Sequence, residues 1–219
     1  MISYLKYYNS ADKSVCEKEA FNFLVTDLLA KNLTGEDKQF TITAHNMEEA
    51  LKKKMLPSIF YLLMYAKPDK PDVIGKIKFY DVCPLIFCLG YNGKTVTGVN
   101  FNLIPNNLRA SILDLIVDTN VPFYENVSTT NVNDIRYNEP LATLFVTDLN
   151  GIASFVAYIK SKTNIDISSC IRTYNVENIK NVRMIEYDEW HHIPFLNFND
   201  SVRGANLASL QSALVQNQR

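Results

Sequence analysis

Short runs of apolar, β-branched and aromatic residues, separated by glycine, asparagine and proline, fill the middle of this chain. They lie at 58–66, 77–80, 85–89 and 95–103. Runs of this length and composition are typical of β-strands. The first run also fits a buried helix, and its aromatic residues together with Pro57 and Pro68 favour the strand. The pattern therefore predicts four short strands between about 58 and 103.

Asn92-Gly93 lies between the third and fourth runs and predicts a β-hairpin. Both central positions of a type I′ turn need a positive φ, which asparagine and glycine tolerate better than other residues. After the fourth run the apolar spacing becomes helical, at Leu108, Ile112, Leu115 and Ile116. This spacing predicts a helix over 106–117, with Asn106 or Asn107 as its N-cap.

The first part of the chain carries two predicted helices. Ser14-Val15-Cys16-Glu17 is a capping box, in which the serine hydroxyl and the glutamate carboxylate each satisfy a free backbone N–H. The helix that follows has its apolar stripe at Phe21, Leu24, Leu28 and Leu29. Asn46 with Glu49 predicts the start of a second, short helix that ends near Met55. Residues 1–12 show no clear period and fit an arm or an edge strand.

The second half of the chain combines predicted helices with one strand. We expect a long surface loop over 118–133, a helix over 136–163 interrupted near 150–151, a further helix over 166–175 and a strand near 182–187. The strand would return to the sheet formed by the earlier runs.

The tail from Asn206 has a helical stripe of leucines, Leu207, Leu210 and Leu214, on an otherwise polar and nearly uncharged segment. An isolated helix of this length is marginal in water, so the stripe must lie on its own domain or on a neighbouring subunit. The neighbour is favoured, because chain ends often become ordered on assembly. These leucines are therefore the candidate partner-binding residues.

Together these elements predict an α+β fold. Its centre is a small, strongly bent sheet or an SH3-like β-barrel, formed by 58–103 and the returning strand near 182–187, with flanking helices. The expected organisation is an N-terminal helical region over 1–56, an α+β core domain over 57–199 and a C-terminal tail helix over 200–219. With 219 residues, 47% of them hydrophobic, the chain can bury a core without disulfides.

Charge and cysteine usage narrow the classes of function. With 22 basic and 23 acidic residues the net charge is −1, which counts against nucleic acid as the main ligand. Cys16, Cys83, Cys88 and Cys170 match no zinc or redox spacing and are predicted to be structural. The N-terminus lacks a signal-peptide pattern and no apolar run is long enough to span a bilayer, so we expect cytoplasmic synthesis and no membrane partner.

The histidines are poorly arranged for a metal site. His191 and His192 are adjacent, so their side chains point to different faces, and we expect them to cap the core together with Trp190. His45, the remaining histidine, has no cysteine, histidine or aspartate at ligand spacing. No metal and no cofactor are predicted.

Three charged or glycine-rich stretches are candidates for a catalytic or phosphate-binding site. Asp69 and Asp72, followed by Lys76 and Lys78, offer carboxylates and a cation for a two-metal nuclease but lack its second carboxylate before the lysine. Residues 90–95 end like a phosphate loop, although the first glycine is misplaced and strand-like residues follow. The lysines at 52–54 are expected to form a solvated helix end. We predict no catalytic residue and no enzyme activity.

Several pieces of the chain form an ordered set of motifs. They are Tyr65-Ala66-Lys67-Pro68, Phe79-Tyr80-Asp81-Val82-Cys83-Pro84-Leu85, the run from Gly98-Val99-Asn100 to Pro105, and Leu108-Arg109. This set resembles a segment of small structural proteins of tailed bacteriophages, in which Tyr-Asp-x-x-Pro-Leu and Gly-Leu-Asn-x-x-x-x-Pro-x-x-x-Arg stand at similar separations. Asn181-Val182-Arg183 followed by Trp190 resembles the C-terminal half of those proteins. The resemblance covers residues 58–195 and does not extend to 1–50.

The resemblance implies a structural subunit of a tailed-bacteriophage virion, from the tail, the baseplate or the head–tail region, synthesised in the host bacterial cytoplasm. Such a subunit acts by binding other virion proteins in a multi-subunit assembly. The many aromatic and amide side chains and the near-zero net charge suit a protein that forms interfaces. The alternative is a viral DNA-end-binding or DNA-processing protein, motivated by the lysines at 52–54 and the lysine-bearing loop at 67–78.

Overall fold

The computed structural model of the protein describes residues 3–22, 55, 57–65, 79–81, 83–124, 149–185, 187–197 and 202–204. The strands are β1 (Phe60–Tyr65), β2 (Phe79–Asp81), β3 (Leu85–Tyr91), β4 (Thr95–Asn100), β5 (Ile171–Asn175), β6 (Ile179–Ile185) and β7 (Val202–Gly204). The α-helices are α1 (Tyr4–Ser10), α2 (Lys13–Phe21), α6 (Asn106–Tyr124) and α8 (Leu149–Thr163). Short 3-10 helices are η2 (Phe101–Leu103), η3 (Ser168–Cys170), η4 (Val176–Asn178) and η5 (Tyr187–Phe195). The predicted α+β class is confirmed.

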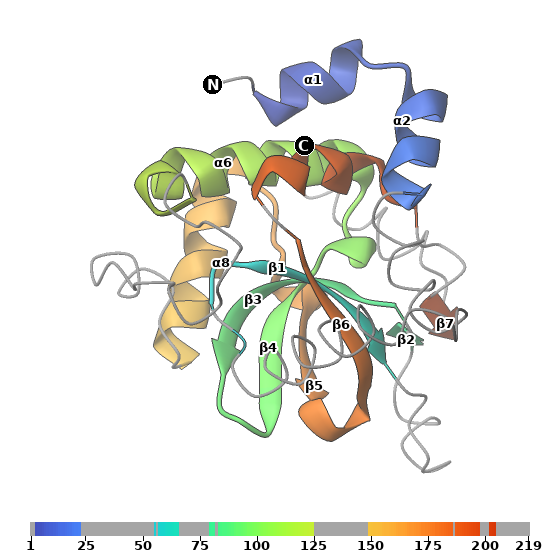
Figure 1. Ribbon diagram of the computed structural model, residues 1–219. Helices are drawn as coiled ribbons and strands as arrows, with labels where there is room; N and C mark the ends of the chain where they lie inside the picture. Colours follow the sequence, from blue (N-terminus) through green and yellow to red (C-terminus); the bar gives the residue numbers. More distant parts are fainter. Residues whose placement is uncertain are drawn as a thin grey trace, which may run out of the picture.

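A five-stranded antiparallel sheet forms the centre, in the order β5-β4-β3-β1-β6 (Figure 1). β5 and β6 lie at opposite edges of this sheet, yet only the three residues of η4 connect them. A flat sheet of this width would hold its edges roughly 19 Å apart. Such a link reaches only about 14 Å when fully extended. The sheet is therefore strongly bent.

The bent sheet is not closed into a barrel, so the SH3-like alternative is wrong. Within the described residues β5 pairs with β4, and β6 pairs with β1. Closure would need a ladder between the two edge strands. The chain between them instead forms η4, with its own bond from Ile179 N to the Val176 carbonyl, in place of the tight turn that starts a hairpin.

An aromatic cluster at the centre of the molecule joins the sheet to η5. The first six residues of β3 are all buried, as expected for a central strand that is covered on both faces. The ring of Phe60 lies 4.8 Å from that of Trp190 and 4.7 Å from that of Phe101, both edge to face. Phe87 stacks on Phe155 of α8 at 5.7 Å. These contacts fix η5 and α8 against the sheet, and such ring pairs add to the stability gained from burial.

Gly98 allows β3 and β4 to approach closely. A Cβ atom built on Gly98 would lie 2.5 Å from the carbonyl oxygen of Phe87. Real Cβ atoms do not come this near to a backbone oxygen, so only glycine fits this position without displacing a strand. The glycine of the Gly-x-Asn motif therefore has a packing role.

The predicted hairpin between β3 and β4 is confirmed, but its turn is not type I′. Gly93 has a φ of +85°, whereas Asn92 is absent from the described non-glycine residues with positive φ. Asn92 contributes its side chain instead, because its Oδ1 accepts hydrogen bonds from Lys94 N and Thr95 N. An asparagine that bonds its own backbone two residues on is a common turn former.

Two helix boundaries differ from the prediction. α6 continues to Tyr124, into the segment 118–133 predicted as a loop, so the Asn, Thr and Val residues there did not end the helix where the sequence indicated. Its first intrahelical bond runs from Arg109 N to the Pro105 carbonyl, so Pro105 and not Asn106 or Asn107 occupies the N-cap position. α8 runs from Leu149 to Thr163 without the predicted break near 150–151.

The helix predicted over 166–175 is wrong. Asn164, with a φ of +60°, ends α8, and the chain continues through η3 into β5. β5 pairs with β4, and the hydroxyl groups of Thr97 and Thr173 lie 2.9 Å apart across the two strands. Pairing with an existing strand decided the conformation of this segment, which local spacing could not show.

The N-terminal residues form two helices. Of the arm or edge strand predicted for 1–12, the strand is wrong where the structure describes it, because α1 occupies 4–10 and Ser3 caps it by accepting from Lys6 N. Asp12, rather than Ser14, caps α2 by accepting from the backbone N–H groups of Ser14 and Val15. The predicted stripe residues Leu24, Leu28 and Leu29 and the helix from Asn46 to Met55 lie outside the described residues, Met55 itself excepted.

The segment 200–219 contains a described strand. Arg203 of β7 pairs with Tyr80 of β2, forming a separate two-stranded sheet. The tail helix predicted from Asn206, with its candidate partner-binding residues Leu207, Leu210 and Leu214, lies outside the described residues. The proposed division into 1–56, 57–199 and 200–219 therefore stays a prediction.

Candidate functional site

Four polar residues meet in the interior where β2, β4, η2 and β5 come together. They are Asp81, Asn100, Asn102 and Tyr174, here called the polar centre, and each is at most 6% exposed. Asp81 Oδ2 accepts hydrogen bonds from Asn100 Nδ2 at 3.0 Å and from Asn102 Nδ2 at 2.7 Å. Its Oδ1 accepts from Cys83 N at 2.9 Å. The carboxylate charge is thus stabilised by three N–H groups of the chain itself.

Asn100 is the branching point of the polar centre. Its Nδ2 also donates to the hydroxyl of Tyr174 at 3.1 Å, which uses both amide hydrogens. Its Oδ1 accepts from Asn102 N at 2.9 Å and so caps η2. One side chain therefore fixes the end of β4, the start of η2 and the positions of β2 and β5.

Tyr174 links the polar centre to the bend of the sheet. Burial, together with the nearby charge of Asp81, raises the pKa of the Tyr174 phenol well above its usual value, so it stays protonated at neutral pH. Its ring lies 5.2 Å from that of Tyr65 on β1. The Tyr65 hydroxyl accepts from Asn175 N at 3.2 Å. β1 and β5 are separated by two strands in the sheet order, so these contacts cross the bend.

Asn102 leaves one acceptor of the polar centre without a hydrogen bond. Its Nδ2 donates to Asp81 Oδ2 and, at 2.9 Å, to the Cys83 carbonyl. Exchanging oxygen and nitrogen would set three oxygens against one another, so the amide orientation is fixed. Its Oδ1 is buried and has no hydrogen-bond partner. A buried acceptor of this kind costs free energy, which the two donated bonds offset.

Arg109 is a second buried polar residue of the motif set, only 2% exposed. It donates from Nε to the Ile104 carbonyl at 2.8 Å, and from Nη1 to the carbonyls of Leu196 at 2.5 Å and Ile193 at 3.5 Å. Burial lowers the pKa of the Arg109 guanidinium to about 10, so it remains charged at neutral pH. The residue therefore ties the start of α6 to the end of η5.

The structure explains the resemblance motifs as parts of the fold. Asp81 lies in the first quoted pattern, Tyr-Asp-x-x-Pro-Leu, whereas Asn100 and Arg109 lie in the second. The structure brings the first two into direct contact and buries all three, with their polar groups bonded to the protein. Such an arrangement positions backbone elements. Tyr174, which completes the polar centre, was not singled out from the sequence, since nothing local distinguishes it from the other tyrosines.

His191 and His192 lie on η5 beside the buried Trp190, but the prediction that their side chains point to different faces is wrong, because their rings contact each other. Trp190 is buried and donates from Nε1 to the Ile185 carbonyl at 3.3 Å. The rings of His191 and His192 are 3.9 Å apart, and both are partly exposed. Burial, and then the charges of His191 and Arg183, lower the pKa of His192 to about 4. In the part of the chain that the structure describes, no group of three or more His, Cys, Asp and Glu side chains could hold a metal ion.

The cysteines occupy different environments. All four are free thiols. Burial raises the pKa of Cys83 and of Cys88 to about 12, and that of Cys170 to about 11. A thiol that stays protonated is a poor nucleophile, which fits the predicted structural role of these three residues.

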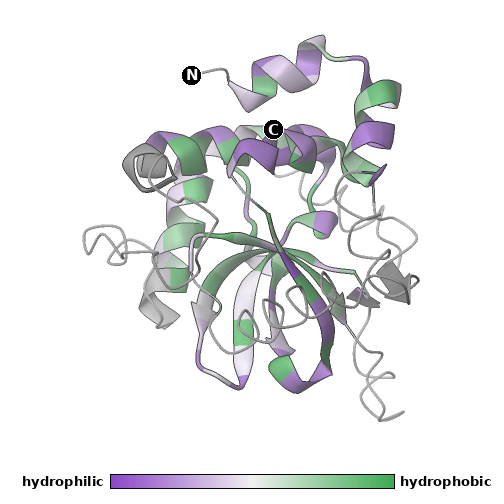
Figure 2. Cartoon of the chain, in the orientation of Figure 1, coloured by the Kyte–Doolittle hydropathy of each residue, from purple (hydrophilic) through white to green (hydrophobic). Residues whose placement is uncertain are grey.

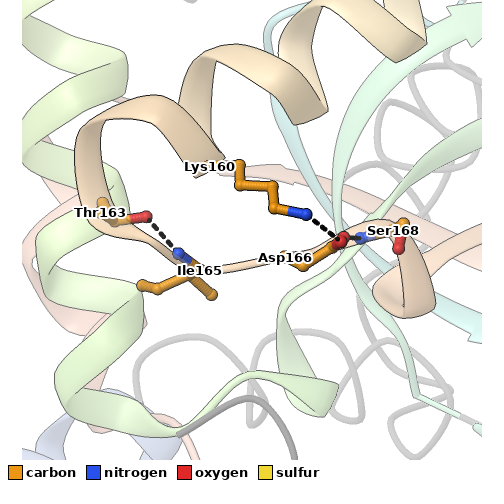
Figure 3. A network of polar contacts seen from close by, with 5 residues as sticks. All are labelled: Lys160, Thr163, Ile165, Asp166 and Ser168. Carbon is orange, nitrogen blue, oxygen red and sulfur yellow. Dashed lines mark hydrogen bonds and ion pairs between the residues drawn. The ribbon is translucent and has the colours of Figure 1, made fainter. Parts of the chain in front are cut away.

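Figure 3 shows how the C-terminal end of α8 is held. Lys160 Nζ donates to Asp166 Oδ2 at 3.0 Å, and Asp166 Oδ1 accepts from Ser168 N at 3.0 Å. Thr163 accepts from Ile165 N at 3.1 Å through its hydroxyl. Hydrogen bonds to Ser168, and then to Lys160, lower the pKa of Asp166 to about 2. The network turns the chain from α8 toward β5.

The chain start is held by a carboxylate on α6. Asp114 accepts from Ser3 Oγ and Tyr4 N, each at 2.6 Å, and from Leu5 N at 3.3 Å. The rings of Tyr7 and Tyr8 lie 5.6 and 5.3 Å from that of Phe195 on η5. Asp114 was not recognised from the sequence, because its partners are about 110 residues away.

The remaining predicted residues lie outside the described part of the chain. They are Lys52, Lys53, Lys54, Asp69, Asp72, Lys76, Lys78 and the tail leucines. Residues 90–95 form the end of β3 and the β3–β4 turn, as the sequence indicated. Across the described helices, none has the length and apolar character needed to cross a membrane.

Comparisons with known proteins found no match among family models, curated proteins or solved structures.

Proposed function

We propose that this protein is a structural subunit of a tailed-bacteriophage virion, in the tail, the baseplate or the head–tail region, and that it acts by binding neighbouring virion proteins. The proposal rests on the resemblance of its motif set to that family. The structure shows what that resemblance consists of, because the motif residues Asp81, Asn100 and Arg109 are buried and bonded to the chain. The resemblance is therefore one of scaffold, and the partner-binding role is inferred from it by analogy.

The direct test is incorporation into particles. The tagged chain is produced during infection, particles are purified on a density gradient and washed, and the ratio of this chain to the major capsid protein is measured by mass spectrometry. We expect a fixed ratio across preparations. The control adds the purified chain to finished particles, and its absence after washing shows that the signal comes from assembly. A chain that is missing from washed particles contradicts the proposal.

The predicted tail helix is the proposed contact with a neighbour. A chain that stops after Ala205 keeps β7, whose Gly204 pairs with Phe79, and removes Leu207, Leu210 and Leu214. We expect unchanged thermal stability and lost incorporation. A large fall in melting temperature would assign the tail to the protein's own core. The matched control replaces the polar residues Gln211 and Ser212 with alanine and leaves the stripe intact.

The DNA-binding alternative is tested on the same protein. Titration of linear duplex with the purified chain should give weak binding at most, consistent with the near-zero net charge. Tight binding that falls steeply with salt concentration would favour the alternative, because each phosphate contact releases a counterion.

A further inference from the structure

The residues that receive α1 form a defined surface on α6 and η5. Asp114 on α6 accepts three donors from the start of α1, and Phe195 on η5 packs against two of its tyrosines. The ring of His191 lies 6.2 Å from that of Tyr7, edge to face. We call Asp114, His191 and Phe195 the arm seat, and α1 with α2 the arm. Figure 1 shows α1 lying over α6, on the side away from the sheet, whereas α2 packs against η5.

The arm packs on the core through partly buried side chains, those of Tyr4, Tyr7, Tyr8, Ala11 and Cys16. α1 has no buried residue, and Ala20 is the buried residue of α2. Figure 2 shows α1 coloured largely as hydrophilic. On α2, Val15 and Phe21 are 49% and 46% exposed. Segments held by few buried apolar contacts are those that open most readily. Asp114 and Phe195 hold the start of the arm through specific polar and aromatic contacts.

The connection between arm and core does not require both to come from one molecule. Residues 23–54 separate α2 from Met55. A stretch of this length can reach on the order of 100 Å when extended. An arm on one copy and a seat on a second copy would make the same contacts as those observed within one chain. The free energy of the exchanged dimer therefore differs from that of two monomers mainly by the entropy lost when two molecules associate.

We propose that the arm seat is an interaction surface for the arm of a second copy of this chain, so that copies exchange arms when they are concentrated together. Asp114 would then bind the start of α1 of the second copy, and Phe195 would pack against the tyrosines at 7 and 8 of that copy. The exchange joins identical subunits through the same arm and arm seat that contact each other within one chain. It goes beyond the proposed virion function and does not depend on it.

The test uses two full-length variants that are each defective in one half of the contact. The seat variant, Asp114→Lys, places a cation against the N–H groups of α1, where a negative charge is favoured. The arm variant combines Ser3→Ala, Tyr7→Ala and Tyr8→Ala and keeps its seat. Neither can dock its own arm, so a mixture pairs the intact arm of the first with the intact seat of the second without competition.

Analytical ultracentrifugation of the mixture should show a species of twice the monomer mass, at concentrations approaching the ~1 mM effective concentration of a tethered segment. Each variant alone should stay monomeric. Fluorescence emission of Trp190 checks that each variant is folded. If Asp114→Lys is not folded, Asp114→Asn replaces it, because asparagine has nearly the same shape as aspartate. A mixture that stays monomeric overturns the proposal. A dimer formed by the seat variant alone also overturns it, because the interface then lies elsewhere.

Discussion

Asn102 donates a 2.7 Å hydrogen bond to the Asp81 carboxylate, which joins the turn after β4 to the short strand β2. The two residues belong to separate motifs of the set that resembles phage structural proteins. Their contact, with that of Asn100 beside it, shows that the motifs meet in one buried network.

Replacing Asp81 should destabilise the protein strongly. In Asp81→Ala the amides of Asn100 and Asn102 and the N–H of Cys83 lose their acceptor in a buried place. We expect a loss of about 3 kcal/mol or more in the free energy of unfolding. Urea denaturation followed by Trp190 fluorescence measures it. Asp188→Asn, at an exposed position, is the control and should change stability by less than ~0.5 kcal/mol. Equal effects of the two changes would show that the network is not stabilising.

Replacing Gly98 should destabilise the protein more than replacing Gly93. Gly98→Ala sets a Cβ atom 2.5 Å from the Phe87 carbonyl oxygen, so β3 and β4 must separate. The expected cost is about 3 kcal/mol, at the upper end for overpacking. Gly93→Ala meets no atom within 4 Å and suffers only its positive φ, at about 1 kcal/mol. Gly93→Val should cost more than this, because a branched side chain tolerates that φ less well.

Thermal melting of the three glycine variants checks this order. The order Gly98→Ala, then Gly93→Val, then Gly93→Ala is expected from the most to the least destabilised. If Gly98→Ala melts like the wild type, the register that pairs Cys88 with Gly98 is wrong.

Arg109→Met should be strongly destabilising although the side chains have similar length. The carbonyls of Ile104, Ile193 and Leu196 would lose a charged donor, at about 1–3 kcal/mol for each group left unsatisfied. Arg109→Lys keeps the charge but cannot present the same fork of donors, so it should recover only part of the loss. Lys162→Met, at an exposed cation of α8, is the matched control. If Arg109→Met and the control unfold at the same urea midpoint, Arg109 does not stabilise the fold.

His192 should make stability depend on pH between about 6.5 and about 4. Its pKa is about 4 in the folded protein, below the ordinary 6.5, because burial and nearby positive charge disfavour the protonated ring. In this range the unfolded chain binds more protons than the folded one, so stability is full above pH 6.5 and falls as the pH drops toward 4. His192→Gln should flatten this part of the profile of urea midpoint against pH.

The effect of His192 is separable from that of Asp166. The Asp166 pKa is lowered to about 2, so its contribution is lost only as the pH falls from the ordinary 3.8 toward 2. A His192→Gln profile that keeps the wild-type slope between pH 6.5 and 4 would assign that slope to another group.

The sequence by itself determined the elements whose pattern is local. Runs of apolar, β-branched and aromatic residues predicted β1, β3 and β4, and Asn92-Gly93 predicted the hairpin. Both signals are local, because strand composition and turn chemistry are properties of neighbouring residues. The spacing from Leu108 to Ile116 predicted α6 for the same reason. The strand predicted near 182–187 corresponds to β6, which begins earlier, at Ile179.

Only the tertiary structure decided the rest, because it depends on partners that are distant in sequence. β5 lies in a segment predicted as a helix and is a strand because it pairs with β4. Asp81, Asn100 and Tyr174 span more than ninety residues and form one network only after the sheet bends. Asp114 became the anchor of the chain start by the same kind of long-range contact. Local propensity carries no information about which residues a folded backbone brings together, and burial then gives those contacts their strength.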